Sequence, residues 1–316
     1  MGLMPDDLAE RVFERIGGLT LSDTSIWRRA QRWGEEIKAA ADAEVAAAHA
    51  LPTRETVIRG EARSEPPKGV SMDGVIINVR GEGHKELKVG CIFDVERPQS
   101  RAGGEEKFAR AVNVSYVGYL GGPKAFGNVV WAEAWRRKWG RALDTIALGD
   151  GAPWIWNVVQ EHFGTSLQAV DYYHAMEHLY HVAYLLYGEG TPKASQYGKQ
   201  MEKVLYQGHA LTIASRTEAL AERRTGDVSR ALKTEAAYFR RYAERMQYME
   251  LREAGWPIGS GTVESGGKQF RARFAGPGMR WSRAGAERLI PIRAAIMSRR
   301  YDEVWSSAYR LAPKVN

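Results

Sequence analysis

Residues 143–156 read Leu-Asp-Thr-Ile-Ala-Leu-Gly-Asp-Gly-Ala-Pro-Trp-Ile-Trp, and this stretch decides the fold class. The short apolar run Leu143–Leu148 is typical of a buried strand, and it ends in a glycine turn around Asp150. Pro153 then suits the first turn of a helix that we expect to reach Phe163. A buried strand, an acidic turn and a helix in succession form the basic unit of an α/β protein.

Further strands are predicted on both sides of this unit. Upstream, Gly74–Val79 is apolar, Leu87–Val95 has the two-residue period of a strand, and Val112–Leu120 is a third strand-like run. A helix is expected at about Lys124–Trp139, and Leu167–Val170 predicts a fifth strand. Three strands, a helix, a strand, a helix and a strand follow the ribonuclease H-like order. We therefore expect an α/β protein with a ribonuclease H-like mixed five-stranded sheet and helices.

The chain from Tyr172 to Leu251 has a helical pattern throughout. Breaks at Gly190-Thr191-Pro192 and at Gly226 divide it into three expected helices. A glycine turn at Pro257–Gly261 then leads into a helix that holds Glu264. The predicted sheet is therefore interrupted by an all-α insertion before the last helix of the core.

The N-terminal region predicts two helices and a linker. Met4–Ile16 is amphipathic, and the second helix, at about 25–49, begins with Ser25-Ile26-Trp27-Arg28-Arg29. These small polar and basic residues suit a helix that reads a DNA groove, although a plain helical arm has the same pattern. The expected domains are an N-terminal helical DNA-binding arm at 1–50, a linker at 51–69, a catalytic core at 70–171 and 252–300, a helical insertion at 172–251 and a C-terminal tail at 301–316.

The composition is that of an ordinary globular protein, with 44% apolar and 26% charged residues. No apolar run approaches the ~20 residues that span a bilayer, and the N-terminus has no pattern of a signal peptide. Cys91 is the only cysteine, which excludes a disulfide framework and a cysteine zinc site. We expect a cytoplasmic protein with no membrane partner.

The net charge of +7 is concentrated at the C-terminal end of the chain. From Leu251 to Asn316 there are 12 Lys and Arg residues against 5 Asp and Glu, whereas the rest of the chain is neutral. A basic face suits a polyanion such as nucleic acid, because Lys and Arg neutralise phosphates. A solubilising surface is the alternative.

Three acids occupy positions that this strand order brings together. Asp73 is expected at the start of the first strand, Asp150 at the end of the fourth, and Glu264 at the start of a late helix. Two hard cations about 3.5–4 Å apart can align a phosphodiester with its attacking and leaving oxygens, and Mg²⁺ prefers oxygen ligands. We therefore expect these acids to bind two Mg²⁺ or Mn²⁺ ions. The glycines expected to leave room for backbone and DNA are Gly74, Gly149 and Gly151.

Five motifs surround these acids. They are Asp73 in its strand, GDGAPWIW at 149–156, DYYHAMEHL at 171–179, GWPIGSGTVES at 255–265 and GMRW at 278–281. Together they resemble the Kra group of bacterial insertion-sequence transposases, whose core is similar to that of Mutator-like transposases. The resemblance covers about Ser71 to Arg300. The chain departs from the group in a shorter N-terminal region and in Gly266-Gly267, where bulkier small residues are expected.

The resemblance implies a role for each of five residues. Asp73, Asp150 and Glu264 would be the catalytic, metal-binding DDE triad, while Asp171 and His174 would form the Asp-x-x-His motif near the site. It implies a transposase, an enzyme that cleaves DNA at transposon ends and joins the freed 3′-OH to target DNA. The implied partners are double-stranded DNA and further copies of the chain.

Basic side chains flank the predicted triad. As phosphate contacts they would position DNA beside the cations, and the alternative is a solvated helix face. Trp281 would either stack on an unpaired base or pack in the core. The expected DNA-binding residues are Lys268, Arg271, Arg273, Arg280, Trp281 and Arg283, together with Arg28 and Arg29.

Two rival functions are compatible with the residues. His174-Ala175-Met176-Glu177-His178 fits the His-x-x-Glu-His pattern of inverted zinc peptidases, with Glu177 as the base. That function leaves Asp73 and Asp150 without a role, and these histidines, with His181, could equally pack the insertion against the sheet. The other rival is a domesticated, non-catalytic DNA-binding protein on the same fold.

Overall fold

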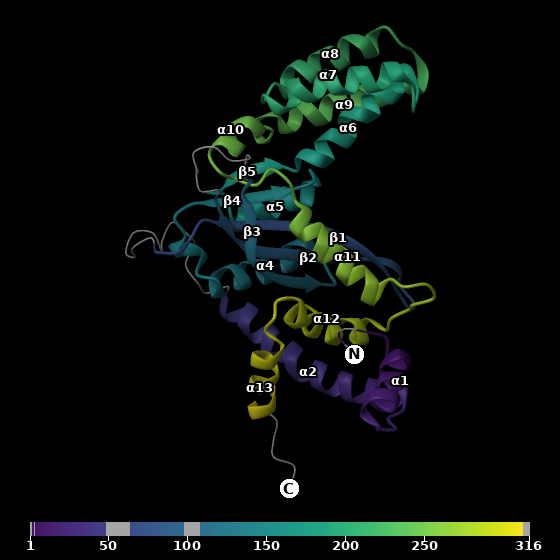
Figure 1. Cartoon of the computed structure of the whole chain (residues 1–316), viewed down its shortest axis with the longest axis vertical. Coiled ribbons are helices and arrows are strands. Elements are labelled where there is room, and N and C mark those ends of the chain that lie inside the picture. The colour runs from purple at the N-terminus through teal and green to yellow at the C-terminus, as the bar shows by residue number, and fades with distance from the viewer. Residues whose placement is uncertain (1, 3, 49–63, 98–107, 312–316) are drawn as a thin grey trace.

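The computed structural model describes residues 2, 4–48, 64–97 and 108–311, in which a five-stranded mixed sheet carries helices on both faces (Figure 1). The predicted α/β class is confirmed. Among these residues, no helix is long and apolar enough to cross a membrane. The strands are β1 (Lys68–Val79), β2 (Gly83–Glu96), β3 (Arg110–Tyr119), β4 (Thr145–Gly149) and β5 (Leu167–Val170).

The spatial order of the sheet is β3-β2-β1-β4-β5. The first three strands are antiparallel neighbours, as predicted, whereas β4 and β5 join parallel to β1 after helical connections. Ser71, near the start of β1, lies opposite Cys91 of β2 and Leu148 of β4. The central strand is therefore flanked on both sides by paired neighbours.

Two pairs of helices cover the two faces of the sheet. They are α4 (Pro123–Arg136) and α5 (Pro153–His162) on one face, and α11 (Gly261–Phe274) and α12 (Arg283–Met297) on the other. A methyl group added to Gly90 of β2 would meet Phe126 of α4, whereas one added to Gly118 of β3 would meet Phe270 of α11. Because both faces are covered, the run from Leu87 to Val95 is buried at every position, although its period predicted one buried face.

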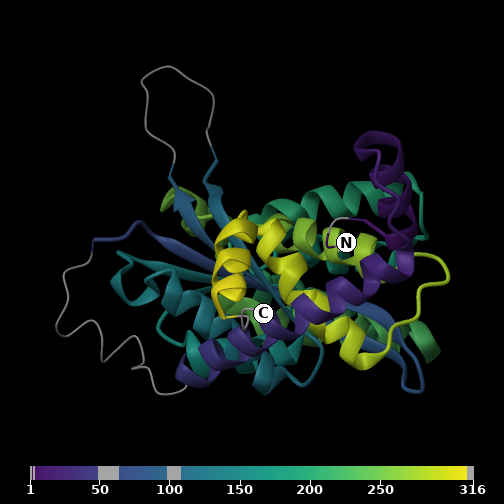
Figure 2. The ribbon, with the colours of Figure 1, turned by 90° about the horizontal axis from the view of Figure 1, so that it is seen from below.

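The N-terminal helices pack on the β3 side of the sheet. These helices are α1 (Asp6–Gly17) and α2 (Asp23–Ala48). Seen from below, α2 runs beside α12, and it also contacts α4 (Figure 2). Gly34 permits the close approach, since a methyl group there would lie 2.7 Å from the carbonyl oxygen of Arg288. The N-terminal arm is thus packed against the core through α2.

The predicted C-terminal tail contains a helix, α13 (Tyr301–Leu311), and residues 312–316 lie outside the described part of the chain. Its amphipathic pattern places Trp305 against Trp33 of α2, with ring centroids 4.7 Å apart. The helix was missed because one short turn of apolar residues near a chain end is a weak signal. Its packing against α2 provides the burial that its length alone does not.

A bundle of helices extends beyond the β5 side of the sheet (Figure 1). The sequence predicted three helices here, and the structure has four long ones. The extra break lies at Gly208, whose φ of +84° is a left-handed conformation that favours glycine. The helices of this region are α6 (Tyr172–Tyr187), α7 (Pro192–Tyr206), α8 (Ala210–Glu222), α9 (Gly226–Tyr242) and α10 (Tyr248–Glu253), and the short 3₁₀ turns of the chain are η1 (Trp139–Arg141) and η2 (Ala243–Arg245).

The first strand begins earlier than predicted. It starts at Lys68, inside the expected linker at 51–69, of which residues 51–63 lie outside the described ranges. A lysine after two prolines gave no strand signal, but Lys68 is only 2% exposed because its ammonium group lies 2.7 Å from Asp94 Oδ1. Asp73 therefore lies inside β1 rather than at its start. An exposed loop is also predicted at Arg97–Glu106 from its polar residues and glycines, but residues 98–107 lie outside the described ranges.

Candidate active site

Asp73, Asp150 and Glu264 line one cavity of about 200 Å³. The strand register explains how the first two meet. Ser71 pairs with Leu148 across the parallel β1 and β4 strands, so Asp73 and Asp150 each lie two residues beyond this pair at the same end of the sheet. Glu264 reaches the cavity from the first turn of α11.

Asp171 connects the element that carries Glu264 to the sheet. Its buried carboxylate caps α6 by accepting a hydrogen bond from the backbone N–H of His174 at 2.8 Å. The same carboxylate accepts a hydrogen bond from the backbone N–H of Ser260, directly before α11. Tyr172 N–H donates to the carbonyl oxygen of Ile258 at 2.9 Å, which doubles this connection. Asp171 does not line the cavity, and its position is that of a structural clamp.

Two glycines let α11 pack closely against the sheet. A methyl group on Gly267 would lie 3.0 Å from Asp73 Oδ2, and one on Gly266 would clash with the ring of Tyr116. The Tyr116 hydroxyl also donates to the carbonyl oxygen of Thr262 at 3.2 Å. The Gly266-Gly267 pair, which departs from the resembled family, therefore has a packing reason in this chain.

The cavity is electrostatically unfavourable for three free carboxylates. Burial raises the pKa of Asp73, and nearby Asp150 and Glu264 raise it further, whereas the Gly74 N–H and Arg271 act in the opposite direction. The net result is a pKa above the ordinary range for Asp73. Mutual repulsion of this kind is what a bound cation would relieve.

The three carboxylates do not converge as they stand. Each is held by a local hydrogen bond: Asp73 from Gly74 N–H at 2.6 Å, Asp150 from Ala152 N–H at 2.8 Å, and Glu264 from the Ser260 hydroxyl at 3.1 Å. Across the described part of the chain, no three His, Cys, Asp or Glu side chains are arranged to hold a metal ion. The chemistry of the donor set still fits a hard cation, because the carboxylates of Asp73, Asp150 and Glu264, together with that of Glu177, line one cavity.

Protein side chains pack closely against the glycines beside the acids. A methyl group on Gly149 would meet Ile155, and one on Gly74 would meet the Glu86 carboxylate. Gly151 has a φ of +99°, and a methyl group there would meet the Tyr238 ring at 3.0 Å. The nearest neighbours of these three glycines are thus protein side chains, and room for DNA beside them stays a prediction.

His174 lines the carboxylate cavity, while the other histidines of α6 turn to a different partner. His178 Nδ1 lies 2.6 Å and His181 Nδ1 lies 2.8 Å from the two carboxylate oxygens of Glu235 on α9. The Tyr238 ring stacks on His178, with 3.7 Å between ring centroids. His178 thus fastens α6 to α9, which favours packing over the His-x-x-Glu-His zinc site.

The structure separates the predicted DNA contacts into two groups. Lys268, Arg271 and Arg280 are exposed, and the first two follow Glu264 by four and seven residues on one face of α11. Arg28 and Arg29 are also exposed, at the start of α2. These five side chains can meet a ligand at the surface.

The other predicted contacts point elsewhere. Arg273 is 3% exposed and its guanidinium packs over the Trp281 ring, 5.0 Å from its centroid. Trp281 is buried, and its indole N–H donates to the carbonyl oxygen of Phe274 at 2.8 Å. Arg283 forms a two-point ion pair with Glu82. The DNA-contact prediction is wrong for Arg273 and Trp281, which belong to the core, and Arg283 already has a carboxylate partner.

Two polar residues of the cavity, Tyr173 and Ser260, were not predicted from the sequence. Tyr173 lines it with a ring that is 64% exposed, and Ser260 contributes the hydroxyl that binds Glu264. Both positions had a signal, because Tyr173 lies inside the Asp171–His174 motif and Ser260 precedes the helix of Glu264 by four residues. Neither side chain is a carboxylate or a histidine, so neither belongs to the residue types that predict a metal site.

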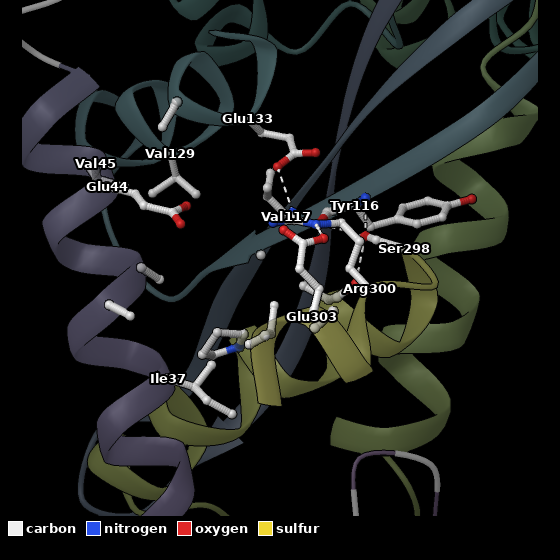
Figure 3. Close-up of a pocket in the computed structure, with 18 residues that line it drawn as sticks. Ile37, Glu44, Val45, Tyr116, Val117, Val129, Glu133, Ser298, Arg300 and Glu303 are labelled. Atoms are coloured by element: carbon white, nitrogen blue, oxygen red, sulfur yellow. Dashed lines mark hydrogen bonds and ion pairs between the residues drawn. The ribbon is translucent and has the colours of Figure 1, made fainter. Parts of the chain in front are cut away.

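A separate apolar cavity of about 170 Å³ lies between α2, α4, α12, α13 and β3 (Figure 3). Small side chains such as Ala40 and Ala294 line it, and an ion pair between Arg300 and Glu133, with 3.3 Å between the charged atoms, lies at one side. None of the residues that line it lines the carboxylate cavity.

Comparison with known proteins gives no relative. No known family model matches the chain, and no curated protein is a significant match to it.

Proposed function

We propose that this protein is a metal-dependent DNA transposase of the DDE type on a ribonuclease H-like core. The observation that carries the proposal is the single cavity lined by Asp73, Asp150 and Glu264. The sheet order, with Asp73 inside β1 and Asp150 directly after β4, agrees with such a core. The resemblance to insertion-sequence transposases supports the same function.

The proposed reaction is two successive in-line displacements at phosphorus. Water attacks the phosphodiester at a transposon end, and the bond to the 3′ oxygen breaks, which leaves a free 3′-OH. That 3′-OH then attacks a target phosphodiester, and the bond to the target's own 3′ oxygen breaks, so no bond to the protein forms. Asp73, Asp150 and Glu264 would hold two Mg²⁺ or Mn²⁺ ions, which supply activation of the attacking oxygen and charge neutralisation of the leaving oxygen.

The residues around the triad would orient the DNA. Lys268 and Arg271 extend from the helix that carries Glu264, so they could bind phosphates that flank the reacting one. Asp171 would keep the start of α11 in place through its bond to Ser260. Because two transposon ends must be held together, the working form would be a homo-oligomer on double-stranded DNA.

Removal of divalent cations is expected to abolish DNA nicking and strand joining. Labelled duplex and supercoiled DNA would be incubated with the protein in EDTA, and then with Mg²⁺, Mn²⁺ or Zn²⁺ added in excess. We expect activity with Mg²⁺ or Mn²⁺ only. DNA binding without cleavage under every condition would favour the domesticated DNA-binding protein. Peptide hydrolysis that depends on one tightly held Zn²⁺ would favour the peptidase.

Replacing Lys268 or Arg271 with alanine is expected to weaken DNA binding about equally for all sequences. Each change removes one phosphate contact, so the slope of log affinity against log salt concentration should fall by roughly 0.9. Fluorescence anisotropy over a salt series measures both quantities. Arg230→Ala is the matched control, since Arg230 is exposed on α9 and already paired with Asp227. An unchanged slope in both α11 variants would contradict the proposed DNA path.

A further inference from the structure

A second cavity, of about 360 Å³, adjoins the carboxylate cavity. Tyr173 and Ser260 line both cavities, so the two spaces meet at the turn before α11. Rings of Phe93, Phe108 and Trp256 contribute to the walls of the second cavity. Its size is within the range of small-ligand sites, and its walls suit a flat, aromatic group.

A buried hydroxyl without a partner lines this second cavity. Ser71 is 0% exposed, and its Oγ has no hydrogen-bond partner among the described residues. It lies two residues before Asp73 in β1, so both side chains are on the same face of the sheet. A buried polar group is normally satisfied, and an unsatisfied one beside a cavity indicates a missing acceptor or donor.

Arg252 is the one charged side chain among the described residues that line the cavity. Arg252 lines it and packs 3.8 Å from the centre of the Phe108 ring, and within the described ranges no ion pair joins it to a carboxylate. The first turn of α11 lies at the same wall. Val263 and Glu264 both donate their N–H to the Ser260 carbonyl, which leaves the preceding N–H groups of the helix for an anion. The cavity thus offers partners for an anionic group and for a flat ring, and a nucleotide carries both.

We propose that this second cavity, defined by Ser71, Tyr173, Arg252, Trp256 and the start of α11, binds one unstacked nucleotide of the DNA strand next to the reacting phosphate. The base would lie against the aromatic walls, and its phosphate would lie between Arg252 and the α11 N-terminus. The inference rests on the proposed function, because the DNA strand would have to pass through the adjoining carboxylate cavity to react there. Binding of one unstacked base in this cavity would fix the position of the neighbouring reacting phosphate in the carboxylate cavity.

The test uses a short oligothymidylate that carries one 2-aminopurine, whose fluorescence reports base stacking. Binding is measured in EDTA, so that no cleavage interferes, with wild type, Arg252→Ala, Tyr173→Ala and the control Arg241→Ala. Arg241 is an exposed arginine of α9 away from both cavities, so its loss removes the same charge. Nicking of supercoiled DNA with Mn²⁺ is measured separately for wild type and for Asp150→Asn.

We expect strong quenching with wild type, Arg241→Ala and Asp150→Asn. Affinity should fall about tenfold in Arg252→Ala and in Tyr173→Ala, with partial loss of quenching. Absent quenching in wild type, or an equal effect of Arg241→Ala and Arg252→Ala, would overturn the nucleotide site. If wild type nicks DNA without quenching, the cavity assignment fails and the proposed function stands. If quenching follows the expected pattern without any nicking, the cavity binds a nucleotide and the proposed function fails.

Discussion

Replacing Asp150 with asparagine, or Glu264 with glutamine, is expected to reduce metal-dependent DNA cleavage by at least about a thousandfold. Such a loss corresponds to roughly 4 kcal/mol in the activation barrier, a reasonable value for losing one of three anionic ligands. Each amide keeps the size of the side chain, so the fold should be intact. The rates would be measured by gel assay of labelled DNA in Mn²⁺.

The same variants should be more heat-stable than wild type without metal. Desolvation raises the pKa of half-buried Asp73, and nearby Asp150 and Glu264 raise it further, so the three carboxylates destabilise one another when ionised. Removing one charge relieves that repulsion, as is common at active sites that trade stability for function. Asp302→Asn, at an exposed acid of α13, is the control and should change neither property. Cleavage at wild-type rates by either amide variant would contradict the triad.

Replacing Asp94 with alanine is expected to lower the free energy of unfolding by about 3–5 kcal/mol. Its Oδ1 lies 2.7 Å from Lys68 Nζ and 2.9 Å from an Arg137 nitrogen, and its Oδ2 accepts a hydrogen bond from Asn113 at 3.0 Å. Since Lys68 is buried, loss of Asp94 leaves its ammonium group in the core with Glu65, 3.6 Å away, as the one remaining ion-pair partner among the described residues. Urea denaturation followed by circular dichroism would measure the change.

A matched control is Asp227→Ala, which removes an aspartate from an ion pair with Arg230 in which both side chains are exposed. Its cost should stay below about 1 kcal/mol. An equal loss of unfolding free energy in both variants would show that the buried Asp94 network stabilises the fold no more than an exposed ion pair does.

The Asp94 network should also be sensitive to acid. Burial raises the pKa of Asp94, but hydrogen bonds from Lys68 and Asn113 outweigh it, so the pKa is below its ordinary value. Because the folded pKa is the lower one, this stability is present above the unfolded pKa of about 4 and is lost as pH falls through the folded pKa. Wild type should therefore lose more stability than Asp94→Asn in that range.

The strands could be predicted because their signal is local. Apolar content and a period of two located β2, β3 and β4 to within a few residues, and Leu167–Val170 was predicted with its observed bounds. The start of β1 could not be predicted, because burial of the Lys68 ammonium group in the sheet depends on its contact with Asp94, which is 26 residues away in the chain. The break at Gly208 was missed because a single glycine within a helical pattern is ambiguous.

The residues of the candidate site also fall into those that the sequence predicts and those that it does not. The three acids were found because strand ends and helix starts have recognisable residues, and the sheet register then brings them to one cavity. The exposure of Arg273 and Arg271 could not be told apart, since both lie in one basic helix and only the packing of α11 decides which face is inward. Asp171 looked like a near-site residue, whereas its contacts are those of a clamp.

Manganese binding tests the central claim most directly, because it does not depend on the DNA sequence at the transposon ends. Electron paramagnetic resonance would count free Mn²⁺ during titration of wild type, Asp150→Asn and the control Asp302→Asn. The carboxylate cavity predicts weak binding of Mn²⁺ by wild type and by the control, and at least about tenfold weaker binding by Asp150→Asn. Equal binding by wild type and Asp150→Asn, or no binding by any of the three, would contradict the claim that these carboxylates act as one cation site.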